Sequence, residues 1–210
     1  MAKKKTEKTR QKILATAERL FTRYGFKKTT IGDICYEGRV SRQTFYRYYL
    51  DKEELLVGYI MHLTAGFLAS FEREAQKRET AVDRMKLLIF EYEELARSST
   101  VLKMLYDLGS DVLWRWSQRS ESRDQMRQIV DTFAGVIRFG VEKGEFPECN
   151  IEWTAYYIYQ LLNNAFFATP SLYPDVIKSR EEEFSAEVTS FILRALMHPM
   201  PDGYEIYGRD

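Results

Sequence analysis

The absence of any proline before Pro147 is the strongest constraint on how this chain can fold, because helices can run uninterrupted through most of it. Across this stretch, apolar residues recur at intervals of three and four, which places them along one face of an α-helix. Few segments show the alternation with a period of two that is typical of a half-buried strand. The sequence therefore predicts an all-α protein. Its 210 residues, 45% of them hydrophobic, are enough to bury a core.

Capping residues indicate where the helices begin and end. Gly25 can end the first helix, Thr30 with Asp33 forms a capping pair for the second, and Ser41 is a good N-cap for the third. A further capping pair, Asp51 with Glu54, opens a long fourth helix. The predicted helices cover about residues 9–24, 30–37, 41–47, a long segment from 51, 80–97, 100–116, 121–143, 151–168 and 180–197. Residues 199–210 are expected to form an extended or frayed tail without an assigned role.

The formal net charge of zero conceals a strong asymmetry along the chain. Residues 1–54 contain 14 Lys and Arg against 7 Asp and Glu, a net charge of +7, whereas the remainder contains 17 against 24, a net charge of −7. A basic segment joined to an acidic body attracts a polyanion at one end of the molecule and repels it from the other. The charge pattern indicates nucleic acid as this polyanion, although basic arms in other proteins serve only solubility.

Several classes of protein lack support in the sequence. There is no run of eighteen apolar residues and no apolar stretch after the basic N-terminus, so we expect a cytoplasmic protein without a membrane segment. The two cysteines, Cys35 and Cys149, and the two histidines, His62 and His198, do not cluster, so no metal site is expected. Cys35 is interpreted as a small buried residue. No catalytic or phosphate-binding motif is present, so we expect neither an enzyme nor a cofactor.

The segments 30–37 and 41–47 have the proportions of a helix-turn-helix, in which the second helix enters the major groove of DNA. The long side chains of Arg42, Gln43 and Arg47 are candidates for reading bases, because Arg suits guanine and Gln suits adenine. The candidates for phosphate contacts are hydroxyl or ammonium donors: Thr30, Ser41, Thr44, Tyr46, Tyr48 and Lys52. From these residues alone, an ordinary pair of packed helices with solvated arginines remains the alternative.

The order of these residues resembles the TetR family of bacterial regulators. The matching stretch is TIGDICYEGRVSRQTFYRYY at residues 30–49, followed by DKEELL at residues 51–56, and the resemblance covers about residues 9–60. It implies a three-helix DNA-binding domain at residues 1–50, joined through the fourth helix to a larger helical domain at residues 51–198 that binds a ligand and forms a dimer.

Two departures from the family pattern lie in and after the turn. Gly38-Arg39 stands where the family usually has Ala-Gly, so either Arg39 takes a positive φ or the turn is shifted by one residue. Gln43 replaces the small residue that usually precedes Thr44, which could change the base that is read.

Aromatic residues are plentiful in the C-terminal part, where each could simply belong to the core. The resemblance implies an inducer pocket among the middle helices, and bulky aromatics beside amides suit such a pocket. The predicted ligand-binding residues are Tyr92, Tyr106, Trp114, Phe133, Tyr156, Gln160 and Asn163. The helices at 151–168 and 180–197 could supply a dimer interface, with the predicted residues Tyr159, Phe166, Phe184, Val188, Phe191 and Ile192.

Two functional hypotheses follow. In the first, the chain is a ligand-responsive repressor that binds a palindromic operator in double-stranded DNA as a homodimer and is released by a small hydrophobic or amphipathic effector. In the second, a TetR-like fold serves as a co-regulator or adaptor that binds a partner protein in place of DNA. The departures at Arg39 and Gln43 leave the second hypothesis open.

Overall fold

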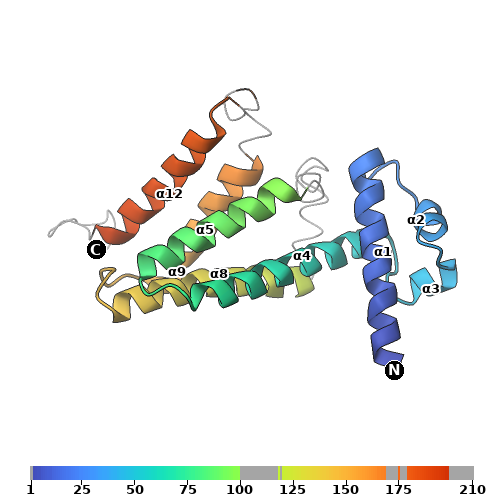
Figure 1. Cartoon of the computed structure of the whole chain (residues 1–210), viewed down its shortest axis with the longest axis horizontal. Coiled ribbons are helices and arrows are strands. Elements are labelled where there is room, and N and C mark those ends of the chain that lie inside the picture. The colour runs from blue at the N-terminus through green and yellow to red at the C-terminus, as the bar shows by residue number, and fades with distance from the viewer. Residues whose placement is uncertain (1, 100–117, 119, 169–174, 176–178, 199–210) are drawn as a thin grey trace, which may run out of the picture. The chain divides into compact units, whose positions relative to one another are not determined.

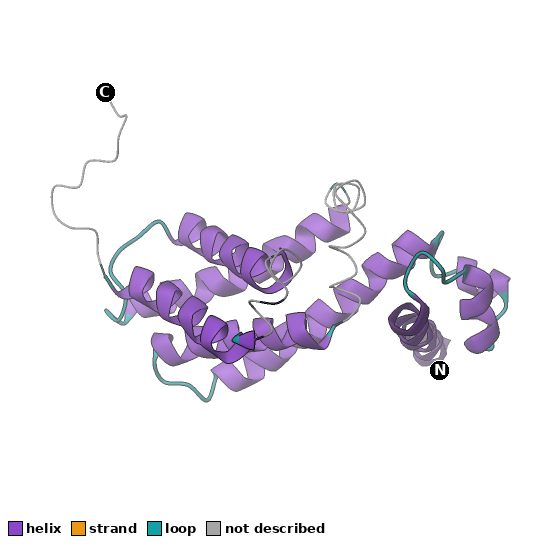
Figure 2. Cartoon of the chain, turned by 90° about the horizontal axis from the view of Figure 1, so that it is seen from above, coloured by secondary structure: helices purple, strands orange, loops and turns teal. Residues whose placement is uncertain are grey.

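A computed structural model describes residues 2–99, 118, 120–168, 175 and 179–198 of the chain. These residues form helices joined by loops, with no strand among them (Figures 1 and 2). The predicted all-α class is confirmed. The described helices are α1 (Ala2–Tyr24), α2 (Ile31–Glu37), α3 (Arg42–Tyr46), α4 (Lys52–Ala75), α5 (Ala81–Ser98), α8 (Ser120–Glu142), α9 (Ile151–Asn163) and α12 (Glu181–Met197). The helix predicted at residues 100–116 and the predicted tail at 199–210 lie outside the described residues.

Two helix boundaries differ from the prediction. Helix α1 begins at Ala2 and not near residue 9, since nothing in the lysine-rich start interrupts a helix. The single helix predicted at 151–168 is α-helical only to Asn163 and continues as a π-helical turn, η1 (Asn164–Ala168). The amides of Asn163 and Asn164 each donate to a carbonyl four residues earlier, at 3.0 and 2.8 Å. Such bonds from side chain to backbone compete with the regular helical pattern.

The short helices α2 and α3 are held at their starts by side-chain caps. Thr30 Oγ1 accepts the Asp33 N–H at 3.1 Å, while Asp33 Oδ2 accepts the Thr30 N–H at 2.8 Å, which completes the predicted capping box. Ser41 Oγ accepts the Thr44 N–H at 3.0 Å in the same way. Helices of seven and five residues do not persist alone in water, so these caps act together with tertiary packing.

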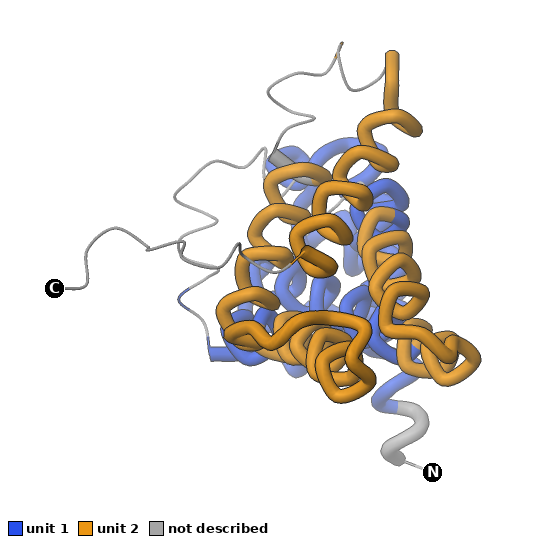
Figure 3. The backbone as a smooth tube through the Cα atoms, turned by 90° about the vertical axis from the view of Figure 1, so that its left-hand side faces the viewer, with its two compact units in different colours: residues 1–69, 94–126 blue, residues 70–93, 127–210 orange. Residues whose placement is uncertain are grey.

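The chain divides into two compact units (Figure 3). Unit 1 contains Met1–Ala69 and Glu94–Met126, and unit 2 contains Ser70–Glu93 and Arg127–Asp210. In unit 1, α1 crosses the start of α4, with α2 and α3 beside it (Figure 1). The core here is formed by fully buried side chains, led by Phe21, Ile34 and Phe45 from the first three helices. Their burial fixes the pair α2 and α3 against α1.

Gly58 of α4 lets the segment after α3 pack closely. A Cβ atom at Gly58 would lie 2.7 Å from Cε1 of the buried Tyr49 ring. No side chain larger than hydrogen fits at this contact without displacing the ring. The glycine, unfavourable within a helix, is therefore explained by close packing with Tyr49.

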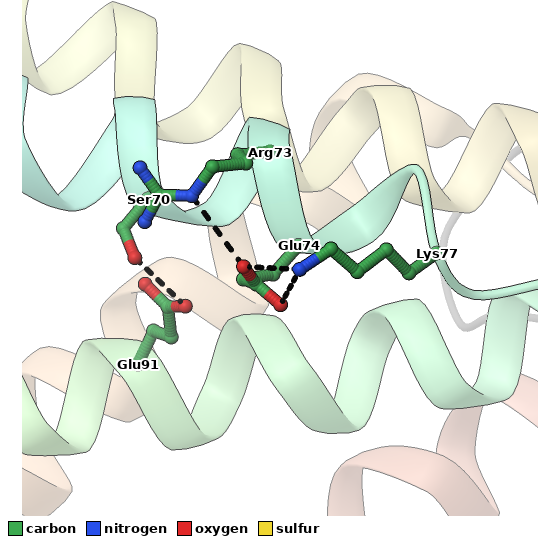
Figure 4. Close-up of polar contacts among 5 residues, drawn as sticks. All are labelled: Ser70, Arg73, Glu74, Lys77 and Glu91. Carbon is green, nitrogen blue, oxygen red and sulfur yellow. Dashed lines mark hydrogen bonds and ion pairs between the residues drawn. The ribbon is translucent and has the colours of Figure 1, made fainter.

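Unit 2 is built around Tyr92 of α5. Its ring lies edge-on to Phe133 of α8 and Tyr159 of α9, with centroids 6.3 and 6.2 Å away, and its hydroxyl donates to Asn163 Oδ1 at 2.9 Å. Polar contacts join the end of α4 to α5, where Ser70 Oγ donates to Glu91 Oε1 at 3.2 Å (Figure 4). These contacts tie three of the helices of this unit to α5.

The end of α4 also carries a small cluster of charges. Glu74 Oε1 lies 2.8 Å from Lys77 Nζ and 3.4 Å from Arg73 Nε (Figure 4). The hydrogen bond from Lys77 lowers the pKa of the Glu74 carboxyl. These contacts are exposed, so they contribute little to stability.

Among the described helices, α4 is long and apolar enough to span a membrane by length and composition alone. Half of its most apolar window is nevertheless buried within the protein, as in the core helix of a folded unit. This feature is weak support for a membrane segment.

The capping box predicts a pH-dependent effect of Asp33→Ala. Hydrogen bonds from the side chain and backbone of Thr30 lower the pKa of the Asp33 carboxyl below its value of about 3.9 in unstructured peptides. A lowered pKa contributes stability above the unfolded value that is lost as the pH falls through the folded value. Asp33→Ala should therefore lower the free energy of unfolding at pH 7, and its difference from wild type should shrink towards pH 2.5, as measured by urea denaturation. Asp131→Ala, at an exposed position of α8, is the control. A difference that stays constant with pH would contradict the prediction.

Candidate nucleic-acid interface

In the turn between α2 and α3, close packing requires glycine at position 38, whereas the positive φ falls on the next residue, Arg39. A Cβ atom at Gly38 would lie 2.7 Å from the Ile34 carbonyl oxygen, so only glycine fits there, with φ of −74°. Arg39 takes the left-handed conformation, with φ of 46°. Of the two arrangements predicted from Gly38-Arg39, the structure has the one in which Arg39 adopts positive φ. The turn is closed by Val40 N–H donating to the Cys35 carbonyl at 3.0 Å.

Helix α3 presents a polar outer face above a buried base. Phe45 and Tyr49 point into the core, whereas Arg42, Gln43 and Arg47 are exposed. Among the described residues, no hydrogen bond or ion pair engages these three side chains. They are therefore available for contacts with an external partner, and their donors match the edges of guanine and adenine in the major groove.

Gly32 of α2 provides the space in which the Arg42 side chain lies. A Cβ atom at Gly32 would be 3.3 Å from Arg42 Nη2. A larger residue at position 32 would press against this guanidinium. Gly32 could not be identified from the sequence, since nothing in the local pattern reveals a neighbour ten residues away.

Two of the hydroxyl groups predicted to contact phosphate, those of Thr30 and Ser41, act as helix caps. Thr30 Oγ1 bonds Asp33, and Ser41 Oγ lies 2.8 Å from Thr44 Oγ1. Thr30, Ser41 and Tyr46 are exposed, while Thr44 and Tyr48 are partly buried. Thr30, Ser41 and Thr44 lie at the starts of α2 and α3, where backbone N–H groups also face outward. Tyr46 and Tyr48 instead lie at and just after the end of α3.

Lys52 has a structural role that was not predicted. Its ammonium donates to the carbonyls of Phe26 and Thr29 at 2.6 and 2.8 Å and lies 4.3 Å from the centroid of the Phe26 ring. Partial burial lowers its pKa. Two of its three N–H donors are therefore used to hold the loop before α2 against the start of α4, which leaves one for a phosphate.

Helix α1 braces the motif along its length. Arg10 Nε donates to Tyr49 Oη at 3.4 Å, and Arg19 Nη1 forms an ion pair with Glu37 at 2.9 Å. Tyr59 of α4 donates its hydroxyl to Glu18 at 2.5 Å. These contacts fix α1 against the segment after α3, the end of α2, and α4.

Cys35 is buried in α2, as predicted, and burial raises the pKa of its thiol. It forms no disulfide, and Cys149 is exposed. No cluster of three or more metal-ligating side chains occurs among the residues that the structure describes.

The predicted ligand-binding residues are only partly brought together. Tyr92, Phe133 and Asn163 share the packed cluster of unit 2 described above, and Gln160 lies one turn before Asn163 on α9. Tyr156 instead is 39% exposed and contacts the rings of Trp153 and Tyr157 on the outer face of α9. Its assignment to an interior pocket is therefore not supported by its position. Tyr106 and Trp114 lie outside the described residues.

The predicted dimer residues also divide into two groups. Tyr159, Phe166 and Ile192 are buried within this chain and offer almost no surface to a second copy. Phe184 and Val188 are partly exposed, and Phe191 is 58% exposed. The exposed aromatic face of α9, formed by Trp153, Tyr156 and Tyr157, was not predicted, although its spacing of three and four could have revealed it.

Comparison with known proteins shows what this helix-turn-helix is similar to. Residues 13–58 match the family model described as bacterial regulatory proteins, tetR family. Over these residues the chain is similar to the TetR family of bacterial regulators. It is 29% identical over 156 residues to the HTH-type transcriptional regulator TtgR of Pseudomonas putida, covering 68% of this chain and 72% of that protein.

Two crystal structures of transcriptional regulators share the fold. FadR from Bacillus subtilis, in complex with stearoyl-CoA, has a TM-score of 0.68 at 16% identity, covering 90% of this chain and 98% of that one. A TetR-family transcriptional regulator from Pectobacterium atrosepticum has a TM-score of 0.67 at 20% identity, covering 93% and 98%. The family match and these relatives support a DNA-binding transcription regulator, and they do not favour the alternative of an adaptor that binds protein in place of DNA.

The Lys52 contacts predict that Lys52→Ala destabilises the protein. Loss of two hydrogen bonds from a partly buried ammonium should lower the free energy of unfolding by about 1–2 kcal/mol. The exposed Lys28→Ala, from the same loop, should leave it nearly unchanged. Urea denaturation followed by circular dichroism measures both. Equal stability of Lys52→Ala and wild type would show that these carbonyl contacts do not hold the loop.

Proposed function

We propose that the protein is a repressor that binds a palindromic operator as a homodimer and leaves it when a small hydrophobic or amphipathic effector binds. Residues 1–50 form the DNA-binding part, and residues 51–198 form the part that binds the effector and the second subunit. The observation that carries this proposal is the capped helix α3, which holds Arg42, Gln43 and Arg47 on its exposed face. The protein acts in the cytoplasm, where its DNA target lies.

Base reading by α3 rests on the side chains that it exposes. Arg42 and Arg47 suit the two acceptors of guanine, and Gln43 suits adenine. Thr30, Ser41, Thr44, Tyr46, Tyr48 and the remaining donor of Lys52 contact phosphates and fix the register of the motif. A two-fold dimer presents two such helices to successive major grooves, about 34 Å apart, which requires a palindromic operator.

The outer face of α9 supports the homodimer. Trp153 and Tyr157 are 59% and 63% exposed, and their rings stack with centroids 6.1 Å apart. Phe191 on α12 is similarly exposed. Large apolar groups of this kind on a soluble protein mark interaction surfaces. We assign this aromatic face, with Phe184, Val188 and Phe191, to the contact between subunits.

The effector is proposed from the kinship with FadR and from the aromatic composition of the chain. The FadR structure holds stearoyl-CoA, an amphipathic molecule with a long apolar chain. An effector that binds one conformation more tightly than another lowers DNA affinity in proportion to that difference. Effector binding releases the DNA if the conformation that the effector favours holds the two α3 helices at a separation that does not match successive major grooves of the operator.

The DNA-binding proposal is tested by selecting genomic fragments with the purified protein at moderate salt. A palindromic sequence should be enriched. Arg42→Ala and Arg47→Ala should each lose about 1–3 kcal/mol of operator binding, about 5- to 150-fold, while binding to unrelated DNA changes much less. Arg127→Ala, on the exposed surface of α8, is the matched control and should bind as wild type does. Absence of an enriched palindrome, with and without candidate effectors, would contradict the proposal.

The dimer proposal is tested by the double variant Trp153→Ala/Tyr157→Ala. Removal of two exposed aromatic anchors should shift the protein from dimer to monomer at micromolar concentration and weaken operator binding by at least about 10-fold. Sedimentation velocity measures the assembly state. Phe90→Ala is the control, since Phe90 of α5 is equally exposed at 57% but lies outside the proposed interface. A double variant that remains dimeric at the wild-type concentration would refute this interface.

A further inference from the structure

Two buried polar side chains on α8 each have an oxygen atom without a hydrogen-bond partner. Ser122 and Gln125 lie one turn apart on the same helix face and are 0% and 5% exposed. Ser122 Oγ and Gln125 Oε1 have no hydrogen-bond partner among the described residues. Buried polar atoms are almost always paired, so two unpaired atoms on neighbouring turns require an explanation.

The contacts of Gln125 with α4 fix which of its atoms is unpaired. Gln125 Nε2 donates to the Ile60 carbonyl oxygen at 3.0 Å and contacts Thr64 Oγ1. A backbone carbonyl can only accept, so the amide nitrogen must face α4. This leaves Oε1, which can only accept, without a donor.

The geometry points to a binding site for the hydroxyl group of a neutral, apolar effector, and we propose that Ser122 and Gln125 form this site. A ligand hydroxyl can donate to Gln125 Oε1 while its oxygen accepts the Ser122 O–H. An ionised carboxylate cannot donate to Oε1, and a hydrocarbon leaves both atoms unpaired. The inference rests on the proposed function as an effector-responsive regulator and names the chemical class of the effector.

The same contacts give the effector a route to the DNA-binding motif within unit 1. Gln125 holds α4 at Ile60 and Thr64, and two turns earlier α4 begins at Lys52, which holds the loop before α2. A ligand that donates a hydrogen bond to Gln125 Oε1 contacts the same side chain whose Nε2 donates to α4. A shift of α4 would then change the position of α3.

The test compares three probes of similar shape on the full-length protein. 1-Naphthol carries a hydroxyl, 1-methylnaphthalene lacks it, and 1-naphthoate carries a carboxylate. Isothermal titration calorimetry should show 1-naphthol binding at least about 10-fold more tightly than either of the others, and operator binding should weaken when 1-naphthol is added. A 1.4 kcal/mol difference corresponds to tenfold, which one satisfied pair of buried hydrogen bonds can supply.

Variants locate the hydroxyl site. Ser122→Ala and Gln125→Leu should reduce the preference for 1-naphthol over 1-methylnaphthalene to less than about threefold. The matched controls Ser120→Ala and Gln128→Leu, both at exposed positions of α8, should keep it. Ser122→Ala removes an atom without a partner, so its melting temperature should not fall below that of wild type. It therefore keeps the test interpretable if Gln125→Leu, which also loses the contacts with α4, unfolds.

Three results would overturn the inference. These are no binding of 1-naphthol up to its solubility limit, equal binding of 1-naphthol and 1-methylnaphthalene, or full retention of the preference in Ser122→Ala, any of which would mean that this pair holds at most water. Operator binding by the ligand-free wild type is measured separately. Its loss would refute the proposed function, whereas its presence with any of these three results would refute only the hydroxyl site.

Discussion

The bonds from Lys52 to two carbonyls of the loop before α2 are the contact on which the helix-turn-helix depends. Helices α2 and α3 contain seven and five residues and cannot position an interface by themselves. Lys52 fixes the loop that enters α2, and the buried Tyr49 ring packs on Gly58 six residues further along α4. Both ends of the motif are thus held by the first turns of one long helix. The exposed face of α3 has a fixed position because the contacts that hold the motif are made by Lys52 and Gly58 of α4.

Helix α4 also receives contacts from outside the motif. Tyr59 bonds Glu18 of α1, and Ile60 with Thr64 receives the amide of Gln125 from α8. These residues follow directly after Gly58, so the supports of α3 and the contacts of α8 occupy consecutive turns of a single element. Such an element can transmit a ligand-dependent shift if it has two arrangements that the ligand and DNA favour differently. The polar contacts of Gln125 are suited to this role since they are few and buried.

The local features of the fold could be predicted, and the features that depend on helix packing could not. The caps at Thr30 and Ser41 were predictable because a cap is made within three residues of the chain. The left-handed Arg39 was one of two predicted arrangements, and the choice was decided by the approach of Gly38 to Ile34. The loop contact of Lys52 and the outward position of Tyr156 depend on how distant helices pack, which the spacing of residues within one helix does not specify. For the same reason, the spacing along α9 did not show that Tyr159 is buried whereas Tyr157 is exposed.

The turn before α3 is a compromise between packing and backbone conformation. Glycine usually takes a left-handed position at little cost, but in this turn Gly38 is required one residue earlier because its α-carbon lies against the Ile34 carbonyl and Thr16. The left-handed position therefore falls to Arg39, where an L-residue with a side chain costs about 1–2 kcal/mol. Bonds from the N–H groups of Arg39 and Val40 to carbonyls of α2, together with the burial of Phe45, offset this cost. The side chain of Arg39 is exposed and adds positive charge three residues before Arg42, in the segment that carries the candidate base-reading residues.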